Sequence, residues 1–419
     1  MPNLYIKSKC GNLPKNLTPN DFSTWNNTLK TNRAGQDTVF VDMALIDKNI
    51  AAIKSMIGNR FAPRIVTKAM PCVGLIGYVA ESFNTNRLMT FSEGVLRDCV
   101  QEFGKFFDIM QGRPLPAAAA KRIIDKFGKA RTSNVKWLID TVARAQEYAA
   151  LNIPMKVCVE LECGVQRGGA HNNTELLAIM DIIDKSPLTF AGFMGYDGHV
   201  IYAGLTANFP GVTPVTPDEE FARVNTRYQA FIDAAKTKYP TWFTKDTIIS
   251  GGGTVTLNYY NAATVTPIND LTFGIGVVDP SAFGDILAAF GLSPALYCTT
   301  FINKRIDNAE LPFVPGLLPS LAVDNPSLQT CFYVNSGAFP GDKVYPQELI
   351  TSPFLDDSTG GEIFANLGSF YGPASLNVHE GDFVFYRPYE GSASAWLGKL
   401  VAIRGTCIEH TWDTVIEQE

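Results

Sequence analysis

Between residues 44 and 290, the sequence alternates short β-rich runs with longer stretches of helical periodicity. This alternation predicts a parallel sheet whose strands are connected by helices. We predict eight strands, at Arg64–Thr67, Arg87–Phe91, Phe107–Gln111, Val135–Ile139, Lys156–Glu162, Phe190–Tyr196, Thr247–Ser250 and Asp270–Gly276. Helices are predicted between them, among others at Ser92–Phe103, Pro116–Phe127, Asn173–Asp184 and Pro217–Tyr239. Eight such units in about 250 residues predict an α/β fold of the (β/α)8 barrel type.

The rest of the sequence predicts a second, mostly β domain. A further β-rich run, Thr38–Met43, exceeds the strand count of the barrel. After Leu292 the helical periodicity fades, and Pro and Gly alternate with β-forming residues. The predicted strands there are Tyr297–Phe301, Thr330–Asn335, Asp382–Tyr386 and Lys399–Arg404. We therefore expect residues 44–292 to form the barrel, and residues 1–43 to join a β domain formed by 293–419.

Composition favours an ordinary globular protein with small-molecule partners. The 419 residues are 46% hydrophobic, which is enough to bury a sizeable core. A net charge of −6 argues against nucleic acid or an anionic membrane as the main partner, since both require a basic surface. The eight cysteines show no CxxC pair, Met1–Gly11 contains no continuous apolar run of the signal-peptide type, and no stretch has the roughly 18 apolar residues of a membrane span. We therefore expect free thiols and a cytoplasmic location.

The predicted strand Lys156–Glu162 has one apolar and one polar face. Cys158, Glu160 and Glu162 share the polar face, because successive side chains of a strand point in opposite directions. In a barrel the apolar face packs under the helices, so the polar face points into the barrel and toward its catalytic mouth. Arg167, just beyond the strand, is the obvious partner of these carboxylates. A structural ion pair and a direct catalytic role of the glutamates are equally compatible with this pattern.

A glycine-rich loop follows the seventh predicted strand. It reads Ser250-Gly-Gly-Gly-Thr254. Glycines allow backbone N–H groups to approach an anion, and the Thr254 hydroxyl adds a donor. Barrels often bind a phosphate after their seventh strand, so we predict a phosphate site formed by Ser250, Gly252, Gly253 and Thr254. A tight turn without a ligand is the alternative interpretation.

Further segments, in order along the chain, accompany this loop. They are TVFVDMALIDKNI (38–50), RIVTKAMPC (64–72), ECGVQRGG (162–169), GYDGH (195–199) and, near the C-terminus, GDFVFYRP (381–388). Together with the loop they resemble the pyridoxal-phosphate enzymes of the alanine-racemase-type fold. Within that fold they are most similar to the D-threonine aldolase and D-serine dehydratase group. The resemblance covers nearly the whole chain and implies pyridoxal 5′-phosphate as the cofactor.

The resemblance also implies roles for single residues. Lys68 matches the lysine that forms the Schiff base with the cofactor. It follows an apolar run, and desolvation there would lower the pKa of its amine and favour this chemistry. Arg167 matches an arginine beside the cofactor ring, and Tyr196 and His199 match a pair that lines the cofactor. For His199, a structural role and contact with the cofactor or acid–base catalysis are equally compatible with the sequence.

The sequence departs from this group at its metal site. The group usually carries a His followed closely by Cys or Asp in the C-terminal β domain, where they bind a divalent metal. The corresponding stretch here, Arg387–Ala393, contains no histidine, and Glu390 alone is a poor transition-metal site. We therefore expect no metal, and we expect Glu390, Tyr389 or His199 to act on the substrate hydroxyl instead.

The resemblance implies a pyridoxal-phosphate lyase that acts on a β-hydroxy amino acid, expected to be of D configuration, by C–C or C–O cleavage. One alternative is an amino-acid racemase on the same scaffold, with Tyr371 or Tyr389 as the second base. Another is a non-catalytic protein that binds pyridoxal phosphate. The resemblance further implies a homodimer in which the β domain of a second chain closes each barrel mouth.

Overall fold

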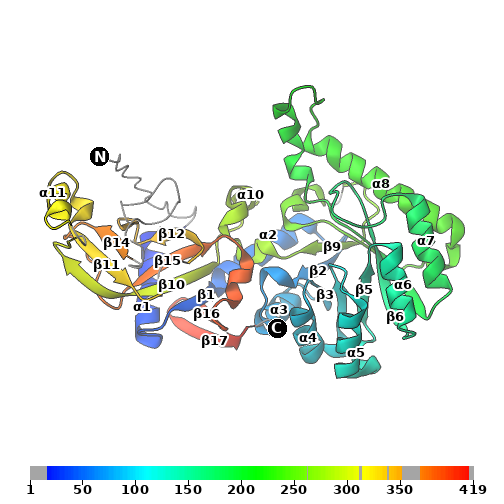
Figure 1. Cartoon of the computed structure of the whole chain (residues 1–419), viewed down its shortest axis with the longest axis horizontal. Helices are drawn as coiled ribbons and strands as arrows, with labels where there is room; N and C mark the ends of the chain where they lie inside the picture. Colours follow the sequence, from blue (N-terminus) through cyan, green and yellow to red (C-terminus); the bar gives the residue numbers. More distant parts are fainter. Residues whose placement is uncertain (1–16, 262, 311–313, 337–338, 352–368, 415–419) are drawn as a thin grey trace. The chain divides into compact units, whose positions relative to one another are not determined.

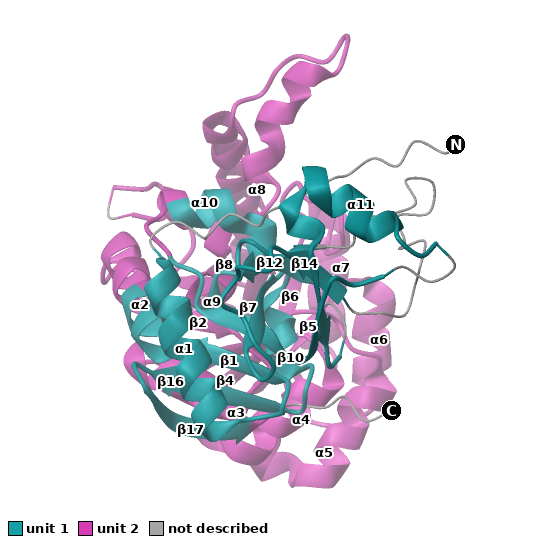
Figure 2. Cartoon of the chain, turned by 90° about the vertical axis from the view of Figure 1, so that its left-hand side faces the viewer, with its two compact units in different colours: residues 1–48, 278–288, 293–412 teal, residues 49–277, 289–292, 413–419 magenta. Residues whose placement is uncertain are grey.

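The computed structural model describes residues 17–261, 263–310, 314–336, 339–351 and 369–414, and these residues form two compact units (Figure 2). Unit 1 comprises residues 1–48, 278–288 and 293–412. Unit 2 comprises residues 49–277, 289–292 and 413–419. The chain therefore passes from unit 1 into unit 2 and back.

Unit 2 contains a closed barrel of parallel strands, as predicted (Figure 1). Its strands are β2 (Ala62–Val66), β3 (Arg87–Thr90), β4 (Asp108–Gln111), β5 (Val135–Ile139), β6 (Met155–Leu161), β7 (Leu188–Gly195), β8 (Ile248–Gly251) and β9 (Asp270–Phe273). Each strand pairs with the next, and β9 pairs back with β2, with Ala62 opposite Asp270. The eight predicted strands are confirmed, although their ends differ by up to a few residues.

Helices follow the strands of the barrel. They are α3 (Val73–Ser82), α4 (Glu93–Glu102), α5 (Ala117–Thr132), α6 (Val142–Ala150), α7 (Asn173–Asp184) and α8 (Pro217–Lys238). Polar side chains begin several of them: the hydroxyl of Ser92 accepts from the N–H of Val95 at the start of α4, and Asn172 accepts from Glu175 at the start of α7. The four helices predicted from the sequence are therefore confirmed.

The prediction was wrong at the end of the last barrel strand. The strand β9 ends at Phe273, whereas we predicted a strand to Gly276. Ile275–Val278 instead form a short helix, α9. A Cβ on Gly274 would lie 2.4 Å from the carbonyl oxygen of Val66, so the chain turns where only glycine can approach β2 this closely.

Unit 1 contains a sheet with the strand order β13-β14-β11-β10-β1-β16-β17, in which β15 pairs with β10 and with β12. Its strands are β1 (Thr38–Asp42), β10 (Leu296–Asp307), β11 (Thr330–Val334), β12 (Gly341–Tyr345), β13 (Ile350–Thr351), β14 (Ser369–Gly372), β15 (Phe383–Pro388), β16 (Lys399–Arg404) and β17 (Cys407–Asp413). The strand β1, which the count left outside the barrel, pairs antiparallel with β10 and parallel with β16.

Two longer helices of unit 1 were missed by the sequence analysis. They are α1 (Pro19–Asn32) and α11 (Leu317–Asp324). The helix α1 buries Phe22, Trp25 and Leu29 against Phe40 and Phe385 of the sheet. It thereby supplies one side of an aromatic core, and the signal that the sequence analysis missed is the helix start at Thr18, Pro19 and Asp21.

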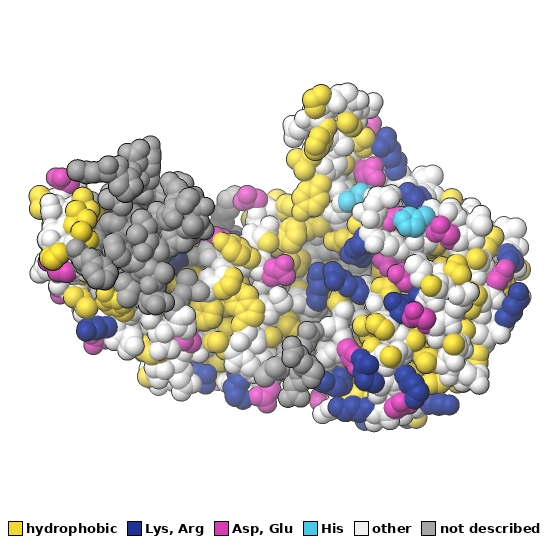
Figure 3. Space-filling model, viewed as in Figure 1, with side chains coloured by type: hydrophobic (Ala, Val, Ile, Leu, Met, Phe, Trp, Pro, Cys, Tyr) yellow, Lys and Arg dark blue, Asp and Glu magenta, His cyan; other side chains and the backbone are white. Residues whose placement is uncertain are grey.

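The remaining helices are α2 (Met43–Ile57), which has 15 residues and lies between β1 and β2, and the short helix α10 (Gly284–Ala289). Exposed apolar side chains gather between His199 and the start of α8, at Tyr202, Leu205, Phe209 and Val212 (Figure 3). In the part of the chain that the structure describes, no helix combines the length and the apolar character needed to cross a bilayer.

Candidate active site

Lys68 lies directly after the first barrel strand, in the short helix η1 (Thr67–Ala69). Its neighbours Thr67 and Ala69 are buried, so the backbone here is fixed by the core. The Lys68 Nζ lies 5.5 Å from the centre of the Phe91 ring, which follows β3. The Lys68 side chain itself is exposed, in contrast to the desolvated amine that we expected. The carboxyl end of a barrel strand is nonetheless the place where barrels carry reactive groups.

The glycine-rich loop after β8 has a backbone that only glycine can adopt without strain. Gly252 has φ +81°, and a Cβ there would lie 2.4 Å from the side chain of Leu271. A Cβ on Gly253 would lie 3.1 Å from the Tyr196 ring, which closes one side of the loop. The loop therefore presents backbone rather than side chains, as an anion-binding loop requires.

Thr254 connects this loop to the loop after β9. Its Oγ1 accepts hydrogen bonds from the N–H groups of Gly274 at 3.1 Å and Gly276 at 3.3 Å. A hydroxyl has one O–H in addition to two lone pairs, so these contacts leave the O–H to donate. Because Gly274 also lies against Val66, the last residue of β2, the loops after β8 and β9 meet the end of the strand that Lys68 follows.

Ser250 points away from this loop. Its side chain is fully buried, and its hydroxyl donates to Asp270 Oδ1 at 2.9 Å. Its carbonyl oxygen accepts from the Tyr228 hydroxyl at 2.9 Å. The contacts of Ser250 thus fix the end of β8, from which the loop begins.

Arg167 connects β6 with Tyr196. Its guanidinium lies 3.5 Å from Glu160 Oε1 and 5.0 Å from the centre of the Tyr196 ring. Burial raises the pKa of Glu160, and the charge of Arg167 opposes this rise. Burial also raises the pKa of Tyr196. The predicted ion pair is confirmed, and it places a cation beside an aromatic ring at the barrel mouth.

Glu162 fixes the loop that carries Arg167. Its carboxylate accepts from the N–H of Gly164 at 2.5 Å and from the N–H of Arg167 at 3.1 Å. Burial alone would raise the pKa of Glu162, but these backbone donors and that of Gln166 lower it below its ordinary value. Glu162 is therefore an ionised carboxylate that shapes the loop.

The predicted parity of β6 is confirmed. Cys158 packs with Met89, Met110, Leu138 and Met194, which come from four other barrel strands. Side chains from five strands can meet in this way only inside the barrel. Glu160, two residues along β6, shares this inner face.

His199 lies after β7, just before the helix η3 (Val200–Asn208). Its Nε2 is 3.1 Å from Glu220 Oε1 on α8. Its Nδ1 is buried and has no hydrogen-bond partner among the described residues. A carboxylate that orients an imidazole is the usual arrangement of a proton-transfer group, although the same pair can be structural.

The candidate residues of the β domain belong to unit 1. Glu390 is exposed and precedes the helix η8 (Gly391–Ala395), and Tyr389 is half-exposed. Tyr371 is buried on β14 in a cluster with Cys331 and Leu318. Burial raises the pKa of Tyr371, so this residue has the properties of a packing residue rather than of a base.

The sequence matches the family model of the alanine racemase N-terminal domain over residues 41–265, which is more than half of the chain. The chain belongs to this family. Proteins of the family depend on pyridoxal phosphate. The match covers the strand of Lys68, the loop of Arg167, Tyr196 and the glycine-rich loop, so the proposed site lies within the family domain.

Solved structures of the same fold include enzymes with different activities. D-threo-3-hydroxyaspartate dehydratase from Delftia sp. HT23 is 15% identical, with a TM-score of 0.62, over 91% of this chain and 98% of that chain. Alanine racemase from Bacillus anthracis is 13% identical, with a TM-score of 0.63, over 90% and 97%. Alanine racemase from Clostridium difficile 630 is 11% identical, with a TM-score of 0.64, over 91% and 99%. These likenesses show the fold. No curated protein matches the sequence.

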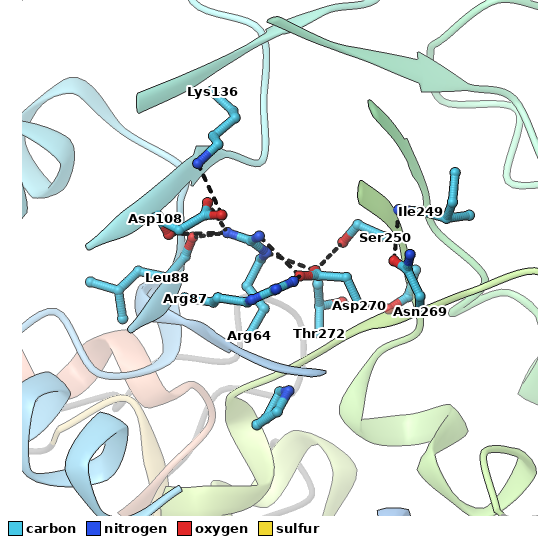
Figure 4. A network of polar contacts seen from close by, with 12 residues as sticks. Arg64, Arg87, Leu88, Asp108, Lys136, Ile249, Ser250, Asn269, Asp270 and Thr272 are labelled. Atoms are coloured by element: carbon cyan, nitrogen blue, oxygen red, sulfur yellow. Dashed lines mark hydrogen bonds and ion pairs between the residues drawn. The ribbon is translucent and has the colours of Figure 1, made fainter. Parts of the chain in front are cut away.

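A buried ion cluster inside the barrel was missed by the sequence analysis (Figure 4). Arg64 of β2 is fully buried and forms ion pairs with Asp270 of β9 at 2.7 Å and with Asp108 of β4 at 2.9 Å. Arg87 also pairs with Asp270, and Lys136 with Asp108. The signal in the sequence was parity, since Arg64 lies two residues before Val66 on β2, and Val66 packs with the cluster inside the barrel.

Asp197, between the two predicted site residues Tyr196 and His199, was also missed. It is buried and accepts hydrogen bonds from Thr256 and Tyr260. Its role was not visible because both partners lie about sixty residues later in the sequence. Within the described ranges, no three His, Cys, Asp or Glu side chains are grouped as a metal site requires.

Proposed function

We propose that this protein is a pyridoxal-phosphate-dependent lyase that cleaves the C–C or C–O bond beside Cα of a β-hydroxy amino acid of D configuration. The observation that carries the proposal is the connection between the two cofactor-binding elements. Gly274 donates to Thr254 in the glycine-rich loop and lies against Val66, two residues before Lys68. An amine for the aldehyde and a loop for the phosphate thus lie on one rim of the barrel.

The residues present fit the cofactor. The primary amine of Lys68 can bind the aldehyde, and Gly252, Gly253 and Thr254 can hold the phosphate through backbone N–H groups and one hydroxyl. The positive φ of Gly252 and its closeness to Leu271 support this assignment, because only glycine keeps the backbone of the loop in this conformation. Ser250 contributes by fixing the end of β8 through Asp270.

Arg167 and Tyr196 would lie beside the cofactor ring. The guanidinium of Arg167 lies 5.0 Å from the centre of the Tyr196 ring and 3.5 Å from Glu160 Oε1, so both neighbours restrain it. The remaining donors of Arg167 can bind the cofactor's phenolic oxygen or the substrate carboxylate.

When bound, pyridoxal phosphate withdraws electrons from the bonds at Cα. The chain supplies the proton transfers. Lys68 Nζ would accept or return the proton at Cα, and His199, oriented by Glu220, would transfer the proton of the β-hydroxyl. Glu390 is a second candidate for the hydroxyl.

A racemase remains the alternative, because the structural neighbours include alanine racemases. A racemase needs a second base on the opposite face of the substrate. Burial argues against Tyr371 as this second base. Tyr389 is half-exposed and is the better candidate. A protein that only binds the cofactor is the third possibility.

Product analysis separates these functions. The purified protein, loaded with pyridoxal phosphate, is incubated with D- and L-β-hydroxy amino acids. We expect an aldehyde or a keto acid from the D isomers. Inversion at Cα without release of either product would favour the racemase, and no turnover with cofactor bound would favour the binding protein.

A matched pair of histidine variants tests the proposed proton transfer. We expect His199→Gln to lower kcat by about 10²-fold or more, because general acid–base catalysis contributes this much. His171→Gln is the control, since the His171 side chain is exposed and lies at the start of α7. Equal activity of the two variants would exclude His199 from catalysis.

A further inference from the structure

We propose that Asp197 is a positioning residue that holds the glycine-rich loop in the shape that binds the cofactor phosphate. This inference rests on the proposed function, because it assumes that the loop receives that phosphate. Asp197 follows Tyr196 at the carboxyl end of β7, and it has no assigned part in the proposed chemistry. Both hydrogen bonds that its carboxylate accepts, however, come from the segment that continues from the loop.

Asp197 accepts two hydrogen bonds from that segment. The Thr256 hydroxyl donates to its Oδ1 at 2.9 Å, and the Tyr260 hydroxyl donates to its Oδ2 at 2.5 Å. Thr256 lies within the helix η5 (Thr254–Tyr259), and Tyr260 directly follows it. The helix begins at the last residue of the loop, so the carboxylate holds the segment at one residue within the helix and at the residue directly after it.

The buried carboxylate of Asp197 depends on these two hydrogen bonds. The residue is 2% exposed, and none of the described Lys or Arg side chains forms an ion pair with it. Burial raises the pKa of Asp197, while the hydrogen bonds of Tyr260 and Thr256 oppose the rise. A buried carboxylate is costly unless its oxygens are hydrogen-bonded, so these two hydroxyls are the groups that make it tolerable.

The two donors and the neighbour Tyr196 also contact the glycines of the loop. The N–H of Thr256 donates to the carbonyl oxygen of Gly253 at 3.0 Å. The Tyr260 ring lies 3.3 Å from the position that a Cβ on Gly252 would occupy. The ring of Tyr196, the residue directly before Asp197, lies 3.1 Å from the position that a Cβ on Gly253 would occupy. Movement of Asp197 or of its two donors would therefore move both glycines.

A loop held in its binding conformation loses less entropy when a ligand binds. If Asp197 acts in this way, weakening its hydrogen bonds should reduce the contribution of the phosphate to binding. Pyridoxal lacks the phosphate and otherwise has the same ring and aldehyde. The ratio of the two dissociation constants therefore reports on the loop alone.

The first test compares two buried tyrosines of the barrel unit. Tyr260→Phe removes one donor to Asp197 and keeps the ring, and Tyr148→Phe removes a buried hydroxyl that donates to the carbonyl of Leu115 at 2.9 Å. Pyridoxal phosphate and pyridoxal are titrated onto the full chain after removal of cofactor. We expect Tyr260→Phe to raise the dissociation constant of pyridoxal phosphate about tenfold and that of pyridoxal less than twofold. Tyr148→Phe should leave the ratio unchanged.

A second pair keeps the inference testable if Tyr260→Phe fails to fold. Thr256→Val removes the other donor at nearly constant shape, and Thr256→Ser retains the hydroxyl. The valine variant should lose the same selectivity for pyridoxal phosphate, and the serine variant should keep it. If the role of Asp197 were merely structural, Thr256→Val and Tyr260→Phe would weaken the binding of both ligands by the same factor.

The outcomes separate this inference from the proposed function. If the unaltered protein binds neither ligand, or binds pyridoxal as tightly as pyridoxal phosphate, the proposed cofactor site is wrong. If the unaltered protein prefers pyridoxal phosphate and the variants keep that preference, the site stands and the role of Asp197 is refuted.

Discussion

Replacement of Arg64 by methionine should destabilise the barrel strongly, because Arg64 is a fully buried cation at the centre of an ion cluster. Its guanidinium pairs with Asp270 at 2.7 Å and with Asp108 at 2.9 Å, and it also donates to the carbonyl oxygen of Leu88 at 3.0 Å. Removal of one partner from a buried ion pair costs about 3–5 kcal/mol, since the other charge stays buried. Arg64→Met should therefore lower the stability of the strands by about this amount.

Hydrogen exchange followed by mass spectrometry measures this loss strand by strand. Since 1.4 kcal/mol corresponds to a factor of ten, exchange in β2, β4 and β9 should become at least about 100-fold faster. Arg122→Met is the matched control, because Arg122 forms an exposed ion pair with Glu93 on the surface. In Arg122→Met, the exchange rates of β2, β4 and β9 should stay within about twofold of those in the unaltered protein. Equal exchange in the two variants would refute the stabilising role of the cluster.

The same cluster predicts a dependence on acid. Burial alone would raise the pKa of Asp108, but the charges of Arg64 and Lys136 outweigh it and lower the pKa from 3.8 to about 2. A carboxyl whose pKa is lower in the folded protein than in the unfolded protein stabilises the fold at any pH above its unfolded-state pKa. This stabilisation is lost as the pH falls through its folded-state pKa. The shift corresponds to about 2 kcal/mol. Exchange in β4 should thus accelerate between pH 4 and pH 2, and less so in Arg64→Met.

Two further predictions follow from the sequence. Chelation of divalent metals should change the activity by no more than about a factor of two, because Arg387–Ala393 lacks the expected ligands; strong inhibition that a divalent ion reverses would contradict this. Sedimentation velocity should give a homodimer of the 45.8 kDa chain, as the resemblance implies; a fully active monomer would exclude it.

The strands of the barrel could be predicted because each is a short apolar run with turn residues on both sides. The position of Lys68 could also be predicted, since it directly follows one of these runs. Parity within β6 was sufficient to place Cys158 and Glu160 inside the barrel and to pair Glu160 with Arg167. In each case the partners are near in sequence or fixed by the period of a strand.

The contacts that were missed join residues far apart in the sequence. Arg64 meets Asp270 only because β9 closes the barrel on β2, and Asp197 meets Tyr260 only because the loops after β7 and β8 are neighbours. Neither pairing leaves a local pattern. The burial of Tyr371 agrees with the packing role that is the more common one for tyrosines in β domains, although the partners of Tyr371 on α11 lie about fifty residues earlier in the sequence.

The attachment of the cofactor to Lys68 is the central claim, and borohydride reduction tests it most directly. The protein is loaded with pyridoxal phosphate, reduced and digested, and the labelled peptide is identified by mass spectrometry. We predict a single labelled lysine, Lys68, and no label in a folded Lys68→Ala variant, which should also lose the visible absorbance of the bound cofactor and all turnover. A label on another lysine, or full labelling of Lys68→Ala, would contradict the account.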